Sequence, residues 1–253
     1  MATIVGVHGA FHQYWGPNQL RSRWLPAVQD GLAHVDVELP DDQFAVAFYG
    51  DLFRPDIEAG RPDDDEIRRI ARQIGLLDLI EERFGEGGYE LLAEELGREH
   101  LRQLINQLGR YFADADQRSA IRSRVERVVG PDTRVVVAHS MGTVVAYEAL
   151  VAHPDWAVDT LVTLGSPLAG EFVRSRLQPP VGDPGSGAWP GVRRWVNVTA
   201  IGDTVVREAD FARWFPRIEV AAVDNGADAH RAEPYLNAAV TGAAIAAGLT
   251  SAG

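Results

Sequence analysis

The stretch VVVAHSMGTVVAYEAL, residues 135–150, decides the fold assignment of this chain. Its apolar run at 135–138 is typical of a strand that is buried on both faces, as in a parallel sheet. The run ends at His139-Ser140, and a helical pattern begins at Gly142. A buried strand that stops on a serine and turns into a helix predicts an exposed serine at the carboxyl end of a sheet.

The same order of strand and helix continues along the chain. Strands are predicted at 3–7, 44–49, 135–138, 160–164, 195–201 and 218–223. Helices are predicted at 14–32, 62–77, 89–112, 117–129, 142–152 and 234–249. This alternation predicts an α/β fold with a mostly parallel sheet flanked by helices. We expect a single domain over 1–253, with a helical cap insertion at about 55–115.

Composition limits the class of protein and its partners. The chain has 253 residues, a formal net charge of -12 and no cysteine, which excludes disulfides and disfavours a nucleic-acid partner. No apolar run is long enough for an integral membrane segment, and the N-terminus lacks a signal peptide's basic region, so we expect a cytoplasmic protein. No metal-ligand cluster or phosphate loop is evident, so neither metal nor cofactor is expected. The sequence carries no signal for the oligomeric state.

The residues around the serine match a nucleophile elbow. Ala138-His139-Ser140-Met141-Gly142 fits Gly-x-Ser-x-Gly between a strand and a helix, with alanine at the first position. Residues two before and two after the serine are pressed together, so both must be small. The helix start would place the Met141 N–H where it can donate to an oxyanion. The alternative is that Ser140 merely caps the helix.

A nucleophilic serine needs a base and an acid, which follow such an elbow in the order Ser, Asp/Glu, His. After Ser140 the only histidines are His153 and His230. His153 ends the helix that starts at the elbow and is better explained as a cation at a helix C-terminus. His230 follows the strand at 218–223 by a loop and is the predicted base. His139 should point away from the serine and only pack.

The predicted acid is Asp203, which follows the strand at 195–201 directly. An aspartate there would orient the imidazole and stabilise its charged form. The alternative is an ordinary turn aspartate favoured by Gly202. Asp224 and Asp228 are rival acids, but both lie in the loop that carries the histidine.

A second oxyanion donor is expected in the turn after the first strand, at 7–11 (VHGAF). The Ala10 N–H is the preferred donor, and the Phe11 N–H is the alternative. Phe11 and His12 are candidates for lining a substrate pocket, whereas His8 is expected to brace the turn.

With these pieces in order, the chain resembles the α/β-hydrolase superfamily over most of its length. The segments that carry the resemblance are VHGAF, AHSMG, VTLGSPLAG, NVTAIGD and DAHRAEPYL. VAHSMG together with VTLGSP is similar to bacterial lipases that also have alanine at the first elbow position. The resemblance implies a Ser140 nucleophile, an Asp203 acid, a His230 base, oxyanion donors at Ala10 and Met141, and no cofactor.

The chain departs from that family's pattern in three places, one of which is the short Pro/Gly-rich loop that follows VTLGSP where the common cap would lie. It starts at the strand that carries His-Gly, so we expect an N-terminally shortened fold without the usual first two strands. The helical insertion precedes the nucleophile strand, whereas the common cap lies later. We therefore expect the insertion to determine specificity.

The expected activity is hydrolysis of a carboxylic ester in a small-molecule acyl substrate, through an acyl-enzyme intermediate. Thioester hydrolysis, peptide cleavage and acyl transfer or cyclisation stay open, because the same triad serves all of them. A non-catalytic binding protein on this scaffold is the third alternative. The apolar cap residues either cover an acyl pocket or simply pack as core: Ile67, Ile70, Ile74, Leu104 and Leu108.

Overall fold

The computed structural model describes residues 2–55, 62–206 and 210–250. The chain forms two compact units. The first comprises Met1–Gly9, Trp15–Phe48 and Arg122–Gly253, and the second comprises Ala10–Tyr14 and Tyr49–Ile121. The expected helical insertion thus falls within the second unit.

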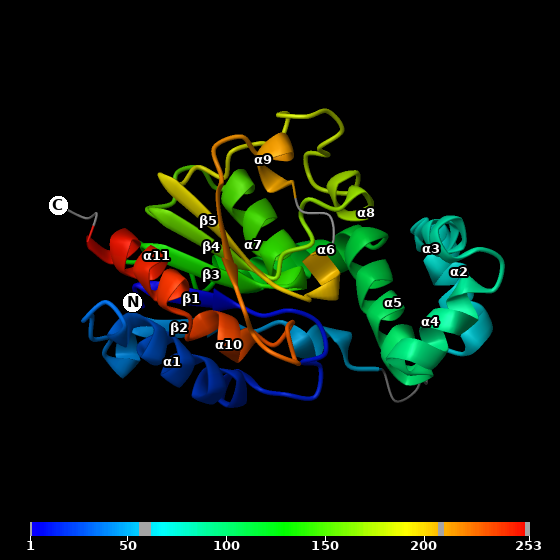
Figure 1. The fold of residues 1–253 in the computed structure, drawn as a ribbon, viewed down its shortest axis with the longest axis horizontal. Helices are drawn as coiled ribbons and strands as arrows, with labels where there is room; N and C mark the ends of the chain where they lie inside the picture. Colours follow the sequence, from blue (N-terminus) through cyan, green and yellow to red (C-terminus); the bar gives the residue numbers. More distant parts are fainter. Residues whose placement is uncertain (1, 56–61, 207–209, 251–253) are drawn as a thin grey trace. The chain divides into compact units, whose positions relative to one another are not determined.

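The first unit is built on a six-stranded sheet in which every pair of neighbours is parallel (Figure 1). Its strands are β1 (Ile4–Val7), β2 (Phe44–Ala47), β3 (Val135–His139), β4 (Thr160–Leu164), β5 (Arg194–Ala200) and β6 (Glu219–Val223). The spatial order is β2-β1-β3-β4-β5-β6. β2 lies on one side of β1, and the later strands lie on the other side, beginning with β3, so the strand order reverses between β1 and β3. The predicted α/β class and parallel sheet are confirmed.

One strand is less buried than its sequence suggests. The run at 218–223 predicts a strand that is buried on both faces, yet β6 lies at the edge of the sheet and none of its residues is buried. Val220 keeps 50% of its surface exposed. The prediction of full burial is wrong because an apolar run does not reveal whether a strand has one neighbour or two.

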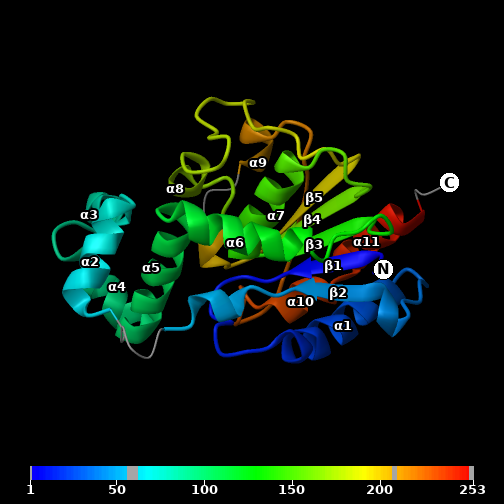
Figure 2. The same ribbon diagram turned by 180° about the vertical axis from the view of Figure 1, so that it is seen from behind.

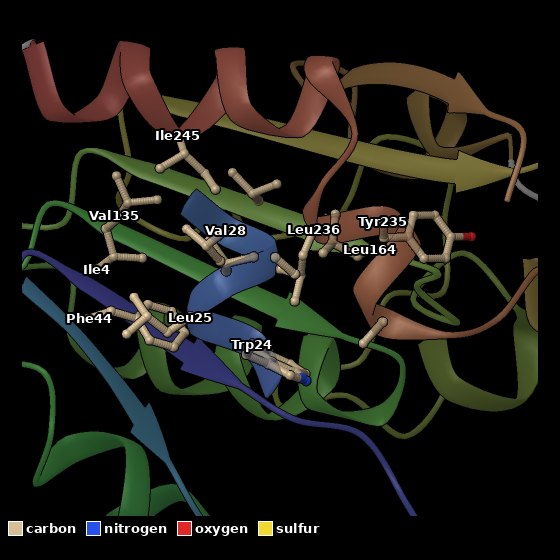
Figure 3. Packing of buried hydrophobic residues seen from close by; sticks show 14 of the residues in the cluster. Ile4, Trp24, Leu25, Val28, Phe44, Val135, Leu164, Tyr235, Leu236 and Ile245 are labelled. Atoms are coloured by element: carbon tan, nitrogen blue, oxygen red, sulfur yellow. The ribbon is translucent and has the colours of Figure 1, made fainter. Parts of the chain in front are cut away.

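Three helices cover one face of this sheet: α1 (Pro17–Ala33), α10 (Ala232–Leu236) and α11 (Ala239–Thr250) (Figure 1). They enclose a core with the inward side chains of the strands. Figure 3 shows Trp24, Leu25 and Val28 of α1 beside Ile4 and Val135 of the sheet. The predicted C-terminal helix at 234–249 is in fact two helices, separated at 237–238.

The opposite face carries α7 (Met141–Ala152), which packs on β1 and β3 (Figure 2). Its Tyr147 ring lies 5.5 Å from Trp195 and 5.6 Å from Phe215. Short helices follow the later strands: α8 (Glu171–Arg174), η3 (Thr204–Val206) and α9 (Phe211–Trp214). A further short helix, η1 (Asp41–Gln43), precedes β2.

The second unit is helical. Its elements are η2 (Gly50–Phe53), α2 (Asp64–Gln73), α3 (Leu76–Phe84), α4 (Gly88–Leu96), α5 (Arg98–Phe112) and the first part of α6 (Ala115–Glu126). Asp63 caps α2 by accepting a hydrogen bond from the Glu66 N–H at 2.9 Å. Ile67 and Ile105 are buried in a core of this unit's own, with Ile70 packed against it, which favours core packing for Ile67 and Ile70.

Two helix predictions in this unit are wrong. The helix expected at 62–77 ends at Gln73, because Gly75 adopts φ +67° and α3 starts immediately after it. The helix expected at 89–112 is likewise divided at Gly97, with φ +86°. Glycine reaches this left-handed conformation without steric cost, and the conformation ends a helix. The apolar spacing continues across both breaks, so periodicity alone does not reveal them.

Candidate active site

The carboxyl ends of five neighbouring strands meet at one edge of the sheet. Five residues follow these ends: Gly9 after β1, Ser140 after β3, Gly165 after β4, Asp203 after β5 and His230 after β6. The strand register aligns these ends, with Val7 opposite Ala138 and Leu164 opposite Val198. Ser140 therefore lies at the point where the strand order reverses, which is where parallel sheets bind ligands.

Ser140 occupies a strained backbone position. Its φ of 54° and ψ of -130° lie outside the regions that L-residues ordinarily adopt. Its N–H donates to the Leu164 carbonyl at 2.9 Å, which ties the turn to β4. Its hydroxyl makes no capping hydrogen bond to α7, so helix capping does not account for this serine.

The turn works only with a very small residue at position 142. A Cβ on Gly142 would stand 2.3 Å from the His8 carbonyl oxygen and 2.4 Å from that of Val7. Both are backbone atoms of β1 and its following turn, so they cannot move aside. Met141 is the first residue of α7, and its N–H has no carbonyl four residues earlier in the helix. The elbow thus presents a serine hydroxyl next to a helix N-terminus.

Ser140, His230 and Asp203 form one chain of hydrogen bonds. The Ser140 Oγ lies 2.9 Å from His230 Nε2, and His230 Nδ1 lies 2.8 Å from Asp203 Oδ2. An ionised carboxylate only accepts, so Nδ1 carries the hydrogen and Nε2 is left to accept the serine proton. The rival Asp224 is exposed and accepts from the Gly226 N–H instead.

The Asp203 side chain is fully buried and accepts three hydrogen bonds. Oδ2 accepts from His230 and from the Tyr235 hydroxyl at 2.7 Å, and Oδ1 accepts from the Val205 N–H at 2.9 Å. Burial raises the pKa of Asp203, but its hydrogen-bond donors outweigh burial, so this pKa lies below its ordinary value. The carboxylate is therefore ionised at neutral pH and ready to stabilise a charged imidazole.

Tyr235, on α10, holds the Asp203 carboxylate by a hydrogen bond. Its hydroxyl donates to Asp203 Oδ2 and accepts from the Ala200 N–H at 2.7 Å. The side chain is fully buried, and burial together with the neighbouring carboxylate raises the pKa of this phenol. A hydroxyl with both a donor and an acceptor partner has one fixed orientation, so Tyr235 fixes the carboxylate in turn.

Gly165 packs closely against the His230 imidazole. Its φ of +53° favours glycine, and a Cβ there would stand 2.9 Å from Asp203 Oδ2 and 3.2 Å from His230 Nδ1. Neither atom can retreat without breaking the hydrogen bond between them. The glycine of the VTLGSP segment is thus required by the Asp203 carboxylate and the His230 imidazole, which pack against it.

The predicted residues Ala10, Phe11 and His12 belong to the second unit. His12 Nδ1 lies 2.8 Å from the Ala10 carbonyl oxygen. The Phe11 N–H donates to Gln107 Oε1 at 3.3 Å, and Phe11 has φ +68°. The assignment of the Ala10 N–H or the Phe11 N–H as second oxyanion donor stays a prediction.

Two buried glutamines, Gln13 and Gln107, link residues 10–14 to α5. Gln107 donates to Gln13 at 3.2 Å, and Gln13 donates to Gln103 at 2.7 Å. Gln13, Gln103 and Gln107 also line a small hollow in the second unit, together with Tyr14, Phe53, Pro55, Pro62, Ile67, Glu99, Arg102 and Asn106. The predicted pocket residues Phe11 and His12 are not among its lining residues.

Several contributors to the site were not predicted from the sequence. Tyr235 and Gly165 had no assigned role, and His139 was expected only to pack. His139 is buried as expected, but its Nε2 also lies 2.8 Å from the His230 carbonyl oxygen. The available signal was proximity in sequence: Tyr235 lies five residues after His230, and Gly165 directly follows a strand. His8 braces its own turn, with Nδ1 2.7 Å from the Gly9 carbonyl oxygen.

His153 is not part of this hydrogen-bonded cluster. It caps the C-terminus of α7, and its Nε2 lies 3.3 Å from Glu126. Within residues 2–55, 62–206 and 210–250, no group of three acidic or histidine side chains is placed to hold a metal ion. Over the same described ranges, no helix is both long and apolar enough to cross a membrane.

Comparison with known proteins does not assign the chain to a family. No protein-family model matches this sequence, and no match is found among curated proteins.

Proposed function

We propose that this protein is a serine hydrolase of the α/β-hydrolase type, in which Ser140 is the nucleophile. The observation that carries the proposal is the unbroken hydrogen-bonded chain from Ser140 through His230 to the buried Asp203. The strained backbone of Ser140 supports it, because residues held in such sparsely populated backbone conformations cluster at functional sites. The order Ser, Asp, His along the chain is that of this fold type.

The proposed reaction is acyl transfer in two steps. His230 Nε2 takes the proton of Ser140 as the serine oxygen attacks the carbonyl carbon of the substrate. The oxyanion that forms accepts hydrogen bonds from the Met141 N–H and from the predicted donor Ala10. The intermediate collapses when the leaving group departs with the proton from His230, and an acyl-enzyme remains.

Water completes the cycle. His230 Nε2 removes a proton from the water as its oxygen attacks the acyl carbonyl carbon, and the Ser140 oxygen leaves with that proton. Asp203 stabilises the imidazolium in both steps and holds the tautomer that the first step requires. Neither step needs a redox change or a second substrate besides water.

A carboxylic ester is the proposed substrate because VAHSMG and VTLGSP resemble lipases with the same alanine in the elbow. The test is a panel of aryl esters of increasing acyl length, with a thioester and an anilide of one acyl group. We expect turnover of at least one ester and none by Ser140→Ala. Turnover of the thioester or anilide with no ester turnover would reassign the substrate class and keep the mechanism.

A further inference from the structure

His139 connects the nucleophile's strand to the backbone of the proposed base. It is the last residue of β3 and immediately precedes Ser140. Its Nε2 lies 2.8 Å from the His230 carbonyl oxygen. A carbonyl oxygen only accepts hydrogen bonds, so Nε2 of His139 carries the hydrogen in this contact. The residue next to the serine thus holds the main chain of the histidine.

The packing around His139 fixes the direction of this hydrogen bond. The side chain belongs to a residue that is 6% exposed. Its ring lies 4.8 Å from the His230 ring, with Trp24 edge-on at 6.4 Å and Tyr235 at 6.1 Å. These rings come from α1, α10 and the loop before α10. A ring enclosed in this way has little rotational freedom, so its N–H is aimed at one acceptor.

His230 needs such support because its loop is mostly exposed. The segment between β6 and α10 makes three hydrogen bonds within itself. The Asn225 amide donates to the Ala229 carbonyl at 3.1 Å, the Gly226 N–H donates to Asp224 at 2.9 Å, and the Arg231 N–H donates to the Asp228 carbonyl at 3.1 Å. All three bonds stay within the loop. Ordering the backbone of each residue costs conformational entropy, so an exposed loop keeps one conformation only where it is tied to the core.

We propose that His139 is a positioning residue that holds the His230 backbone so that its imidazole meets both Ser140 and Asp203. The proposal rests on the proposed function, since it concerns the base of that same triad. His139 acts through His230 and takes no proton in the reaction. Its contribution is geometric: a base displaced by about 1 Å loses up to roughly 100-fold in rate.

Two substitutions of equal length separate a positioning role from simple packing. His139→Gln places an amide N–H close to where Nε2 lies, whereas His139→Met has the same length and no donor. We measure the second-order rate constant for labelling by a fluorophosphonate, which reports on Ser140 and His230 without a known substrate. We expect H139Q within about threefold of the wild type and H139M lower by roughly 10- to 100-fold. Circular dichroism checks the fold of each variant.

A matched control and a spectroscopic measurement complete the test. His153→Met changes a histidine whose contacts lie outside the triad, so labelling should stay at the wild-type rate. Proton NMR should show a downfield His230 Nδ1–H signal in the wild type and H139Q, identified by its loss in Asp203→Asn. We expect this signal to broaden or disappear in H139M, and in the branched variant His139→Leu.

The outcomes distinguish this proposal from the proposed function. If H139M labels as fast as H139Q and keeps the downfield signal, His139 only packs and the proposal is overturned. If the folded wild type is not labelled at all, the proposed function fails. In that case the comparison of NMR spectra still decides whether His139 holds His230 against Asp203. A loss of the signal in H139M, with retention in H139Q, would support the positioning role by itself.

Discussion

Replacing Tyr235 with phenylalanine removes one oxygen atom and two hydrogen bonds. Asp203 loses a donor to its charged carboxylate, a bond worth about 1.5–3 kcal/mol. The buried Ala200 N–H loses its acceptor, which costs about 1–3 kcal/mol. The two losses share one atom, so we expect a combined loss of about 2–4 kcal/mol in the free energy of unfolding. For a chain of this size the melting temperature should fall by roughly 4–16 °C.

The same substitution should change the response to acid. The pKa of Asp203 is depressed in the folded state, so its stabilising contribution is present above the unfolded-state pKa. That contribution is lost as the pH falls through the folded-state pKa. Y235F removes one of the donors that depress this pKa, so the loss should begin at a higher pH. KM should stay unchanged, because Tyr235 is fully buried.

The assay compares Y235F with Tyr147→Phe. Tyr147 is also fully buried, but its hydroxyl donates to the Ala188 carbonyl at 2.9 Å, on the other face of the sheet. Y147F should lose about 1 kcal/mol and keep the wild-type response to acid. The reasoning about Asp203 would be refuted if Y235F melted at a lower temperature but lost stability at the same acid pH as the wild type.

Three further substitutions test other parts of the site and fold. Asp203→Asn should lower turnover by about 10⁴-fold with little change in KM, measured on the best ester; an unchanged rate would move the acid to Asp224. Gly142→Ala should destabilise the protein by about 3 kcal/mol in urea unfolding, since its methyl group meets two backbone carbonyls of the β1 turn; a neutral effect would contradict the tight elbow. Gly109→Ala should lower the free energy of unfolding of the second unit by about 1–3 kcal/mol, because its Cβ would stand 2.2 Å from Ile70 Cγ2. Hydrogen exchange in α2 and α5 measures this loss, and unaltered exchange would contradict that packing.

The proposed roles of Ser140, Asp203 and His230 could be predicted from the sequence because each residue comes after an apolar run that predicts a strand. Their order along the chain, Ser, Asp, His, is the order expected after a nucleophile elbow. The spatial order of the strands was not predicted, since β2 lies outside β1 and no local pattern encodes that choice. The same absence of neighbour information explains why the edge strand β6 was expected to be buried.

The supporting residues could not be identified in the same way. Tyr235 reads as one more apolar position of a helix, and only the folded chain brings its hydroxyl to Asp203. Strand alternation predicts that His139 points away from Ser140, but the sequence does not reveal that its ring meets the His230 carbonyl. Both contacts join residues that are far apart in the chain. The local spacing of apolar residues therefore does not predict them.

The most direct test of the central claim is covalent labelling of the folded protein by a fluorophosphonate, followed by mass spectrometry of the intact chain and its peptides. The account predicts one adduct per chain, located on Ser140, and no adduct in Ser140→Ala. It also predicts slow labelling of His230→Ala, because the serine then lacks its base. Absence of an adduct on the folded wild type, or an adduct on another serine, would contradict the claim that Ser140 is an activated nucleophile.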